Sequence, residues 1–190
     1  MSSLRITGGT LRGRRVAVPA FDVRPTSERA RQAYFNIVGE RIGGSRFLDL
    51  FAGSGIFSFE ATSRGAAAAT AIDFDRRNST SIEKQAAAFG VPVKAVSGDV
   101  LTVLKRLADP VDLVYADPPY DYEQYEDLVR GIAELPLSPD ALVAVEHRRR
   151  TSPFGDSVGK LAAVRRAEYG EVWITFFSAG VATGLAEQNE

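Results

Sequence analysis

Residues 47–57 read FLDLFAGSGIF, in which one apolar run passes through two glycines into a second apolar run. This pattern is typical of a β-strand that turns sharply into an α-helix. Gly53 and Gly55 permit the tight turn and leave bare backbone for a ligand to approach. Asp49 lies inside the expected strand, where a carboxylate needs a polar partner or a ligand contact. We therefore expect a ligand site at this turn.

The alternation of strand and helix continues on the C-terminal side of this turn. Strands are expected at 47–51, 68–73, 93–97, 111–116 and 141–146, with helices at 56–64, 76–89, 101–107 and 122–133. Single helices between strands favour a parallel, doubly wound α/β sheet, which binds ligands beyond the carboxyl ends of its strands. Segments 161–169 and 171–178 are separated only by Gly170 and predict an antiparallel hairpin at the sheet edge.

The chain of 190 residues suffices for one core, and we divide it into a small extension at 1–45, a catalytic domain with the ligand site at 46–179 and a flexible tail at 180–190. No cysteine and a single histidine exclude disulfides and multi-histidine metal centres, so we expect no metal. No run approaches the roughly 18 apolar residues that span a bilayer, and no signal-peptide core follows Met1. We expect a cytoplasmic monomer that makes no membrane contact.

The N-terminal extension is basic. Residues 1–46 hold nine arginines and three acids, a balance of +6, whereas the whole chain carries −1 and the remainder therefore −7. A basic head on an acidic body indicates a polyanion such as a nucleic acid, with a solvated basic surface as the alternative. Residues 4–19 predict a β-hairpin and residues from Pro25 onward a helix. The candidate RNA contacts are Arg5, Arg12, Arg14, Arg15, Arg24, Arg29 and Arg31.

The turn at 51–55 suits S-adenosylmethionine (SAM) better than NAD. Ser58 stands where the dinucleotide fingerprint needs a third glycine, which disfavours a pyrophosphate. Asp73 ends the next strand, at the position where an acidic residue accepts hydrogen bonds from ribose hydroxyls. SAM has a ribose and a cationic amino-acid end but no phosphate. The candidate cofactor contacts here are Asp49, Phe51, Gly53, Gly55 and Asp73.

Two further acids follow strands in this part of the chain. Asp99 ends the third strand, where its carboxylate could accept from the adenine amino group while Val100 packs on the ring. An Asp that caps the following helix is an equally good interpretation of Asp99. For Asp75, two residues after Asp73, we favour a helix cap over a second ribose contact.

The segment Asp117-Pro118-Pro119-Tyr120 follows the strand expected at 111–116. Two prolines fix the backbone and remove two N–H groups, so the loop presents hydrogen-bond acceptors. Asp117 and the carbonyl of Pro118 can accept both hydrogens of an amine attached to a ring, which directs the nitrogen lone pair toward a methyl donor. Tyr120 can stack on the ring. We favour this function over a purely structural proline turn.

These motifs together resemble class I SAM-dependent methyltransferases, and most closely the RsmD family of bacterial 16S rRNA guanine-N2 methyltransferases. The resemblance covers nearly the whole chain. It rests on the arginine-rich motifs near residues 5–15 and 24–31, on LDLFAGSG at 48–55, on SRGA at 63–66 and on DPPY at 117–120.

The resemblance implies a Rossmann-like seven-stranded sheet with an antiparallel C-terminal hairpin, preceded by a hairpin and helix. It implies that Asp49, Gly53, Gly55, Asp73 and Asp99 bind SAM and that Asp117, Pro118 and Tyr120 hold the target amine. It also implies that the basic extension binds 16S rRNA of the small ribosomal subunit or its assembly intermediate, and that guanine 966 is methylated. Asp73 departs from the family pattern, in which we expect a glutamate, but a carboxylate is kept.

Two other functions share some of these features. Asp-Pro-Pro-Tyr also occurs in DNA adenine-N6 methyltransferases, and a related loop occurs in enzymes that methylate glutamine side chains. The absence of a visible target-recognition domain argues against sequence-specific DNA modification. An RNA-binding assembly factor without turnover is the alternative from another class. The intact Asp117 and the complete cofactor turn argue against it.

Overall fold

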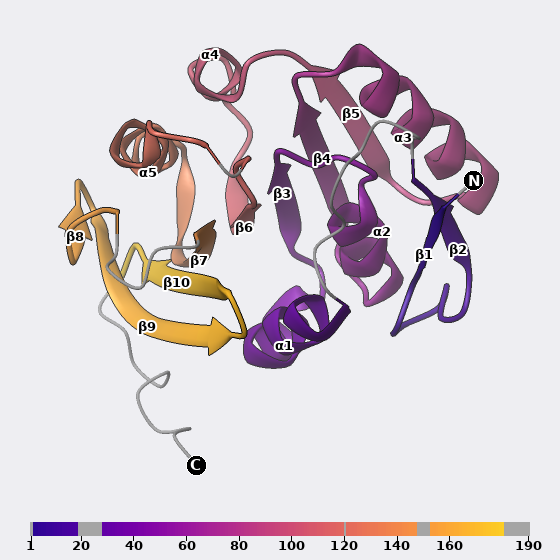
Figure 1. The fold of residues 1–190 in the computed structure, drawn as a ribbon, viewed down its shortest axis with the longest axis horizontal. Coiled ribbons are helices and arrows are strands. Elements are labelled where there is room, and N and C mark those ends of the chain that lie inside the picture. The colour runs from indigo at the N-terminus through magenta and orange to yellow at the C-terminus, as the bar shows by residue number, and fades with distance from the viewer. Residues whose placement is uncertain (1, 19–27, 120, 148–152, 181–190) are drawn as a thin grey trace.

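The computed structural model describes residues 2–18, 28–119, 121–147 and 153–180. Eight strands of these ranges form one mixed sheet in the order β5-β4-β3-β6-β7-β10-β9-β8 (Figure 1). The parallel strands are β3 (Arg46–Leu50), β4 (Ala68–Asp73), β5 (Val93–Ser97), β6 (Val111–Ala116) and β7 (Leu137–His147). The antiparallel strands are β8 (Ser157–Val158), β9 (Leu161–Tyr169) and β10 (Val172–Ser178).

This sheet confirms the Rossmann-like fold with an antiparallel C-terminal hairpin. It has eight strands where seven were expected, because the two residues of β8 pair with the start of β9. A strand of two residues is too short to leave a periodic pattern in the sequence. β7 also begins at Leu137, four residues before the start that was expected.

The helices form two layers (Figure 1). On one face of the sheet, buried apolar side chains of the helices pack against those of β3, β4 and β6. The helices of this layer are α1 (Glu28–Val38), α2 (Ile56–Ser63) and α3 (Arg76–Phe89). The other layer contains α4 (Val100–Leu104) and α5 (Tyr125–Ala133). A short 3-10 helix, η1 (Gly39–Ile42), follows α1. Among the helices in the described ranges, none is long and apolar enough to cross a membrane.

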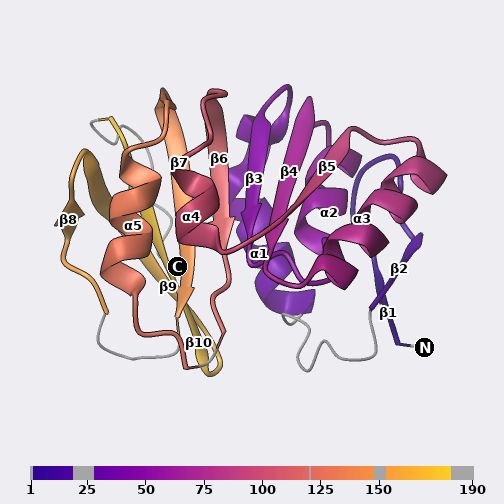
Figure 2. The same cartoon turned by 90° about the horizontal axis from the view of Figure 1, so that it is seen from above.

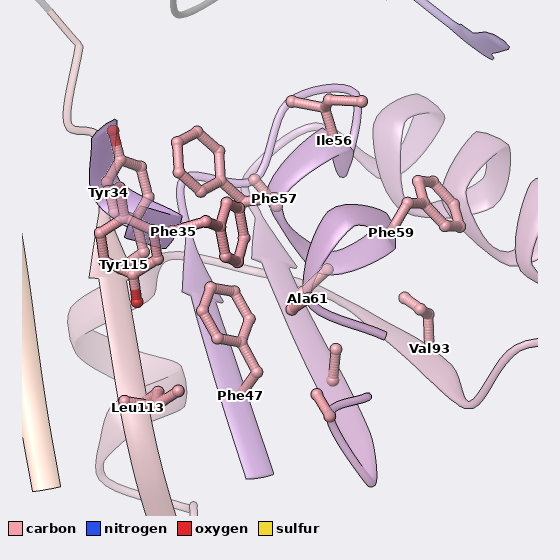
Figure 3. Packing of buried hydrophobic residues seen from close by; sticks show 14 of the residues in the cluster. Tyr34, Phe35, Phe47, Ile56, Phe57, Phe59, Ala61, Val93, Leu113 and Tyr115 are labelled. Carbon is pink, nitrogen blue, oxygen red and sulfur yellow. The ribbon is translucent and has the colours of Figure 1, made fainter. Parts of the chain in front are cut away.

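Aromatic side chains pack α1 onto the sheet (Figure 3). The Tyr34 ring of α1 lies 4.9 Å from the Tyr115 ring of β6, and Phe57 of α2 stacks on Tyr115 at 3.7 Å. Tyr115 also donates a hydrogen bond of 2.6 Å from its hydroxyl to Glu146 Oε2. Such ring pairs contribute about 0.5–1.5 kcal/mol each beyond the area they bury. The helix of the extension is therefore part of the same core as the strand that leads to Asp117.

The N-terminal hairpin consists of β1 (Ser3–Arg5) and β2 (Arg15–Ala17) and lies beside α3 at one end of the molecule (Figure 2). Its loop contacts the last turn of α2, where Thr10 N donates to Ser63 O and Leu11 N to Ser63 Oγ, both at 2.8 Å. Gly9 has a φ of +73°, and a Cβ there would lie 1.8 Å from Ser63 O. Only glycine allows the loop to approach the helix this closely.

A buried charge cluster completes this attachment. Glu60 of α2 is fully buried and accepts hydrogen bonds from Thr7 N at 2.9 Å, Thr7 Oγ1 at 2.6 Å and Arg64 Nε at 2.9 Å. Arg31 of α1 is also fully buried. Its Nε lies 3.5 Å from Glu60 Oε2, and its Nη2 donates to the carbonyl of Arg5 at 2.8 Å. Glu60 thus connects the hairpin, α1 and α2. The boundary at residue 45 stays a prediction, although both sides of it contribute to one core.

Replacing Glu60 by glutamine is expected to lower the free energy of unfolding by about 3–5 kcal/mol, because Arg31 would be left as a buried charge without a countercharge. Urea denaturation of Glu60→Gln and of the wild type measures this loss. The control is Glu40→Gln, which removes a carboxylate from the exposed surface of η1. A Glu60→Gln variant as stable as the control would show that the cluster does not hold the extension in place.

Candidate active site

The β3–α2 turn has three residues with left-handed backbone. Phe51, Gly53 and Gly55 have φ values of +61°, +53° and +75°. A Cβ at Gly55 would lie 2.8 Å from Ile82 Cγ1, so helix α3 leaves room only for glycine there. Phe51 adopts this conformation in spite of its side chain, which costs of order 1–3 kcal/mol and is typical of functional sites. The surrounding structure therefore stabilises a backbone conformation of this turn that is unfavourable for Phe51 in isolation.

Asp73 fixes the turn from the end of β4. Its Oδ2 accepts a hydrogen bond from Gly53 N at 2.8 Å. Its Oδ1 accepts from Asp75 N at 2.8 Å and from Asn78 Nδ2 at 3.1 Å. An ionised carboxylate has about four acceptor positions, so Asp73 retains capacity for a ligand hydroxyl. The candidate ribose contact thus also organises the turn and the start of α3.

Asp49 lies beneath the turn, only 2% exposed. Its Oδ2 accepts from Ser58 N at 3.1 Å and from Ser58 Oγ at 2.7 Å. Burial raises the pKa of Asp49 to about 7, the two Ser58 hydrogen bonds oppose this rise, and the charges of Asp73 and Asp117 add to it. Asp73 and Asp117 are therefore both close enough to repel the Asp49 anion, and a cationic ligand beside Asp49 would relieve this repulsion.

Asp75 and Asp99 both cap helices. Asp75 accepts from Arg77 N at 2.8 Å at the start of α3, which confirms the interpretation favoured from the sequence. Asp99 Oδ1 accepts from Thr102 N at 2.9 Å and from Thr102 Oγ1 at 2.8 Å at the start of α4. A contact of Asp99 with adenine stays a prediction. Val100 is 3% exposed in the core under α4, so it presents very little surface to a ligand.

The loop after β6 begins beside the β3–α2 turn. Asp117 N donates to the carbonyl of Leu50, the last residue of β3, at 3.3 Å. Further along, Pro119 O accepts from Tyr122 N at 3.0 Å. Pro118 is buried and Asp117 is half-buried. Tyr120 lies outside the described residues, so its stacking role stays a prediction. The structure thus brings Asp117 to the same edge as Asp49 and Asp73.

Two aromatic residues at this edge were missed from the sequence. Phe74 directly follows Asp73 and is 81% exposed, although large apolar side chains are usually covered. The Tyr122 ring lies 5.2 Å from the Phe51 ring, and burial followed by the charge of Asp99 raises the pKa of Tyr122 to about 12. Within the described part of the chain the buried Tyr122 hydroxyl has no hydrogen-bond partner. Both positions are candidates for contact with a ring of the ligand.

The candidate RNA contacts divide into surface and interior residues. Those exposed are Arg5, Arg12, Arg14, Arg15 and Arg29. Arg24 lies outside the described residues. Arg31 is wrong as an RNA contact in this structure, because its guanidinium is fully buried against Glu60. The single histidine, His147, is buried, and its Nε2 lies 2.9 Å from Thr175 Oγ1, which is typical of a structural residue.

Comparison with known protein families places this chain among methyltransferases. The family model described as Conserved hypothetical protein 95 matches residues 4–178. The ribosomal RNA small subunit methyltransferase D of Escherichia coli (strain K12) is 35% identical over 146 residues, which make up 75% of this chain and 74% of that protein. The protein of the same name from Haemophilus influenzae is 31% identical over 150 residues, covering 75% and 78% of the two chains.

Solved structures agree with these relatives. An Escherichia coli structure described as a proposed methyltransferase has a TM-score of 0.82 and 30% identity, and it covers 95% of this chain and 100% of that chain. A Haemophilus influenzae structure described as a proposed methylase has a TM-score of 0.79 and 25% identity over the same shares. The chain therefore belongs to the family of the ribosomal RNA small subunit methyltransferase D enzymes, and it is a methyltransferase.

Proposed function

We propose that this methyltransferase transfers the methyl group of SAM to the exocyclic N2 amine of guanine 966 in 16S rRNA, within the small ribosomal subunit or its assembly intermediate. The observation that supports this most directly is the hydrogen bond from Asp117 N to Leu50 O. It brings the acceptor-rich Asp117-Pro118 loop against the turn that is the candidate cofactor site. A target amine and a methyl donor would then be bound next to each other.

The charges at this edge fit SAM. The charge of Asp73, and after it that of Asp117, repels the Asp49 anion and adds to the raised pKa of Asp49. A ligand with positive charge on its sulfur and amino groups would reduce this repulsion. When bound, SAM supplies an activated methyl group on a positive sulfur. Asp49 and the bare backbone of Gly53 and Gly55 would hold its amino-acid end, and Asp73 its ribose.

The Asp117-Pro118 segment would hold the guanine amine. One amine hydrogen would be donated to the Asp117 carboxylate and the other to the carbonyl of Pro118. These two hydrogen bonds orient the nitrogen lone pair toward the methyl carbon, so that positioning supplies most of the catalysis. As the new N–C bond forms and the S–C bond breaks, the nitrogen loses one proton, which Asp117 can accept.

The exposed arginines of the hairpin support an RNA substrate. Arg12, Arg14 and Arg15 lie on the exposed surface of the hairpin, which Glu60 and Ser63 fasten to α2. Guanidinium groups bind phosphate oxygens in a bidentate manner, which gives affinity without sequence preference. The relatives named small subunit methyltransferase D support 16S rRNA as that RNA. The monomeric state and the cytoplasmic location remain predictions.

The substrate is tested with radiolabelled SAM. The protein is incubated separately with small subunits that lack the modification, with naked 16S rRNA, with DNA and with ribosomal protein, and the products are digested. We expect label in N2-methylguanosine from ribosomal RNA. Label in adenine or in glutamine would contradict the guanine assignment. Bound SAM without any transfer would favour the assembly factor.

Replacing Asp117 by alanine is expected to reduce the single-turnover rate of methyl transfer by at least about a hundredfold, because one of the two acceptors for the amine is lost. The dissociation constant for SAM should change little. Asp121→Ala is the matched control, since it removes an exposed carboxylate close to the same loop. A large loss of SAM affinity in Asp117→Ala would show that Asp117 belongs to the cofactor site instead.

The affinity for SAM is expected to increase by up to about tenfold between pH 6 and pH 8, because Asp49 ionises near pH 7 and its anion attracts the cationic ligand. Calorimetric titration across this range measures the effect. The amino group of SAM titrates in the same range, so Asp49→Asn is the control that retains the ligand titration. An equal pH dependence in both proteins would exclude Asp49 as its source.

In the absence of ligand, ionisation of Asp49 is expected to lower the folding stability as the pH rises, whereas it raises the affinity for SAM. The pKa of Asp49 is raised from its ordinary value of 3.8 to about 7, so the folded protein binds this proton more tightly than the unfolded chain. The contribution of Asp49 to folding stability is therefore fully present below about pH 4 and is lost as the pH rises toward 7. The Asp49→Asn variant should lack this loss in denaturation experiments.

A further inference from the structure

The arginines at the hairpin loop lie far from the catalytic edge. The hairpin contacts Ser63 at the end of α2, and the guanidinium of Arg14 lies 5.5 Å from the ring centre of Phe89, the last residue of α3. Helices that follow parallel strands run back to the amino ends of those strands. Asp73 and Asp117 instead lie at the carboxyl ends. The distance between the two groups is about the length of α3, roughly 20 Å.

Cationic and hydroxyl side chains line about 12 Å of this distance on the exposed face of α3, from Arg76 to Lys84. Arg76, Thr80 and Lys84 are exposed and follow one another at every fourth residue, about 6 Å apart along the helix axis. Together with Arg77 and Ser81 they line a hollow of about 430 Å³. Arg77 forms an ion pair with Asp75, and its side chain remains 65% exposed.

One end of this α3 face lies at the candidate cofactor site, and the other lies at the N-terminal hairpin. At its start, Arg76 follows the cap Asp75 and lies three residues after Asp73. Toward its end, Gln85 Oε1 accepts a hydrogen bond from Ala17 N of β2 at 2.7 Å, so the hairpin lies directly beside the helix (Figure 2). The positive end of the helix dipole adds to the attraction for anions at Arg76. Glu83 is an exposed acid on the same face, seven residues after Arg76.

We infer that the α3 face binds the sugar-phosphate backbone of the rRNA between the hairpin and the catalytic edge. Arg76 and Lys84, about 12 Å apart with Ser81 between them along the helix, can each bind a phosphate of one RNA strand, and such contacts position RNA without reading its sequence. The inference rests on the proposed function, because it deepens the account of how the same substrate is held. It assigns Arg76, Ser81 and Lys84 to RNA binding, while the Thr80 hydroxyl donates to the carbonyl of Arg76 at 2.9 Å.

The test measures binding and transfer separately. Binding of unmodified small subunits and of naked 16S rRNA is measured at several salt concentrations for the wild type and for Arg76→Ala/Lys84→Ala. We expect the double variant to bind roughly tenfold more weakly, and the slope of log affinity against log salt to become shallower by about 1.4–1.8. The dissociation constant for SAM and the rate of transfer at saturating RNA should be unchanged.

Two controls separate this effect from general loss of charge. Lys105→Ala/Arg106→Ala removes two exposed cations that follow α4 in the opposite helix layer, and it should leave RNA binding unchanged. Glu83→Gln removes the exposed acid on the α3 face and should strengthen RNA binding. Thermal unfolding of each variant checks that the fold is retained.

The possible results are distinguishable. Equal losses of RNA affinity in both double variants would overturn the α3 assignment, because any two surface cations would then contribute alike. Weaker SAM binding in Arg76→Ala/Lys84→Ala would assign these residues to cofactor binding instead. A wild type that binds no RNA would overturn the assignment together with the proposed function. RNA binding that depends on α3, without methyl transfer to RNA, would refute the proposed function and retain the α3 surface.

Discussion

Parallel pairing of β4, β3 and β6 is the constraint on which the site depends. Because these three strands are neighbours and point the same way, Asp73, the turn after Leu50 and Asp117 meet at one edge of the sheet. The hydrogen bonds from Gly53 N to Asp73 and from Asp117 N to Leu50 O then join the ends of the strands. Residues that are 68 positions apart in the chain, such as Asp49 and Asp117, are thereby brought close enough to influence each other's charge.

Much of this arrangement could be predicted from the sequence because it depends on local patterns. The strands and helices repeat with clear apolar periods, and an Asp before a helix, such as Asp75, is a recognisable cap. Strand ends of a parallel sheet share one edge, so the positions of Asp73 and Asp117 follow from topology. The antiparallel C-terminal hairpin followed from the single glycine between two apolar segments.

Other features depend on contacts between distant residues. Arg31 has the sequence environment of an exposed basic residue, and only the folded chain shows that Glu60, 29 residues later, receives it in the interior. Val100 follows a strand-end acid, yet the packing of α4 buries it. Tertiary structure likewise leaves Phe74 exposed. It also leaves the Tyr122 hydroxyl without a hydrogen-bond partner among the described residues. A pattern of residue types carries no information on burial of this kind.

Helix α2 connects the β3–α2 turn to the N-terminal hairpin. Its N-cap is Gly55 of the candidate cofactor turn, and it ends at Ser63, to which the hairpin is hydrogen-bonded. Its eight residues are about 12 Å long. Because an α-helix has a fixed rise per residue, α2 sets the distance between the hairpin, which would hold RNA, and the turn, which would hold the methyl donor. Insertion of one residue would rotate the two ends relative to each other by about 100° and misalign them. The length of α2 would therefore matter to methyl transfer as much as the side chains of the candidate site do.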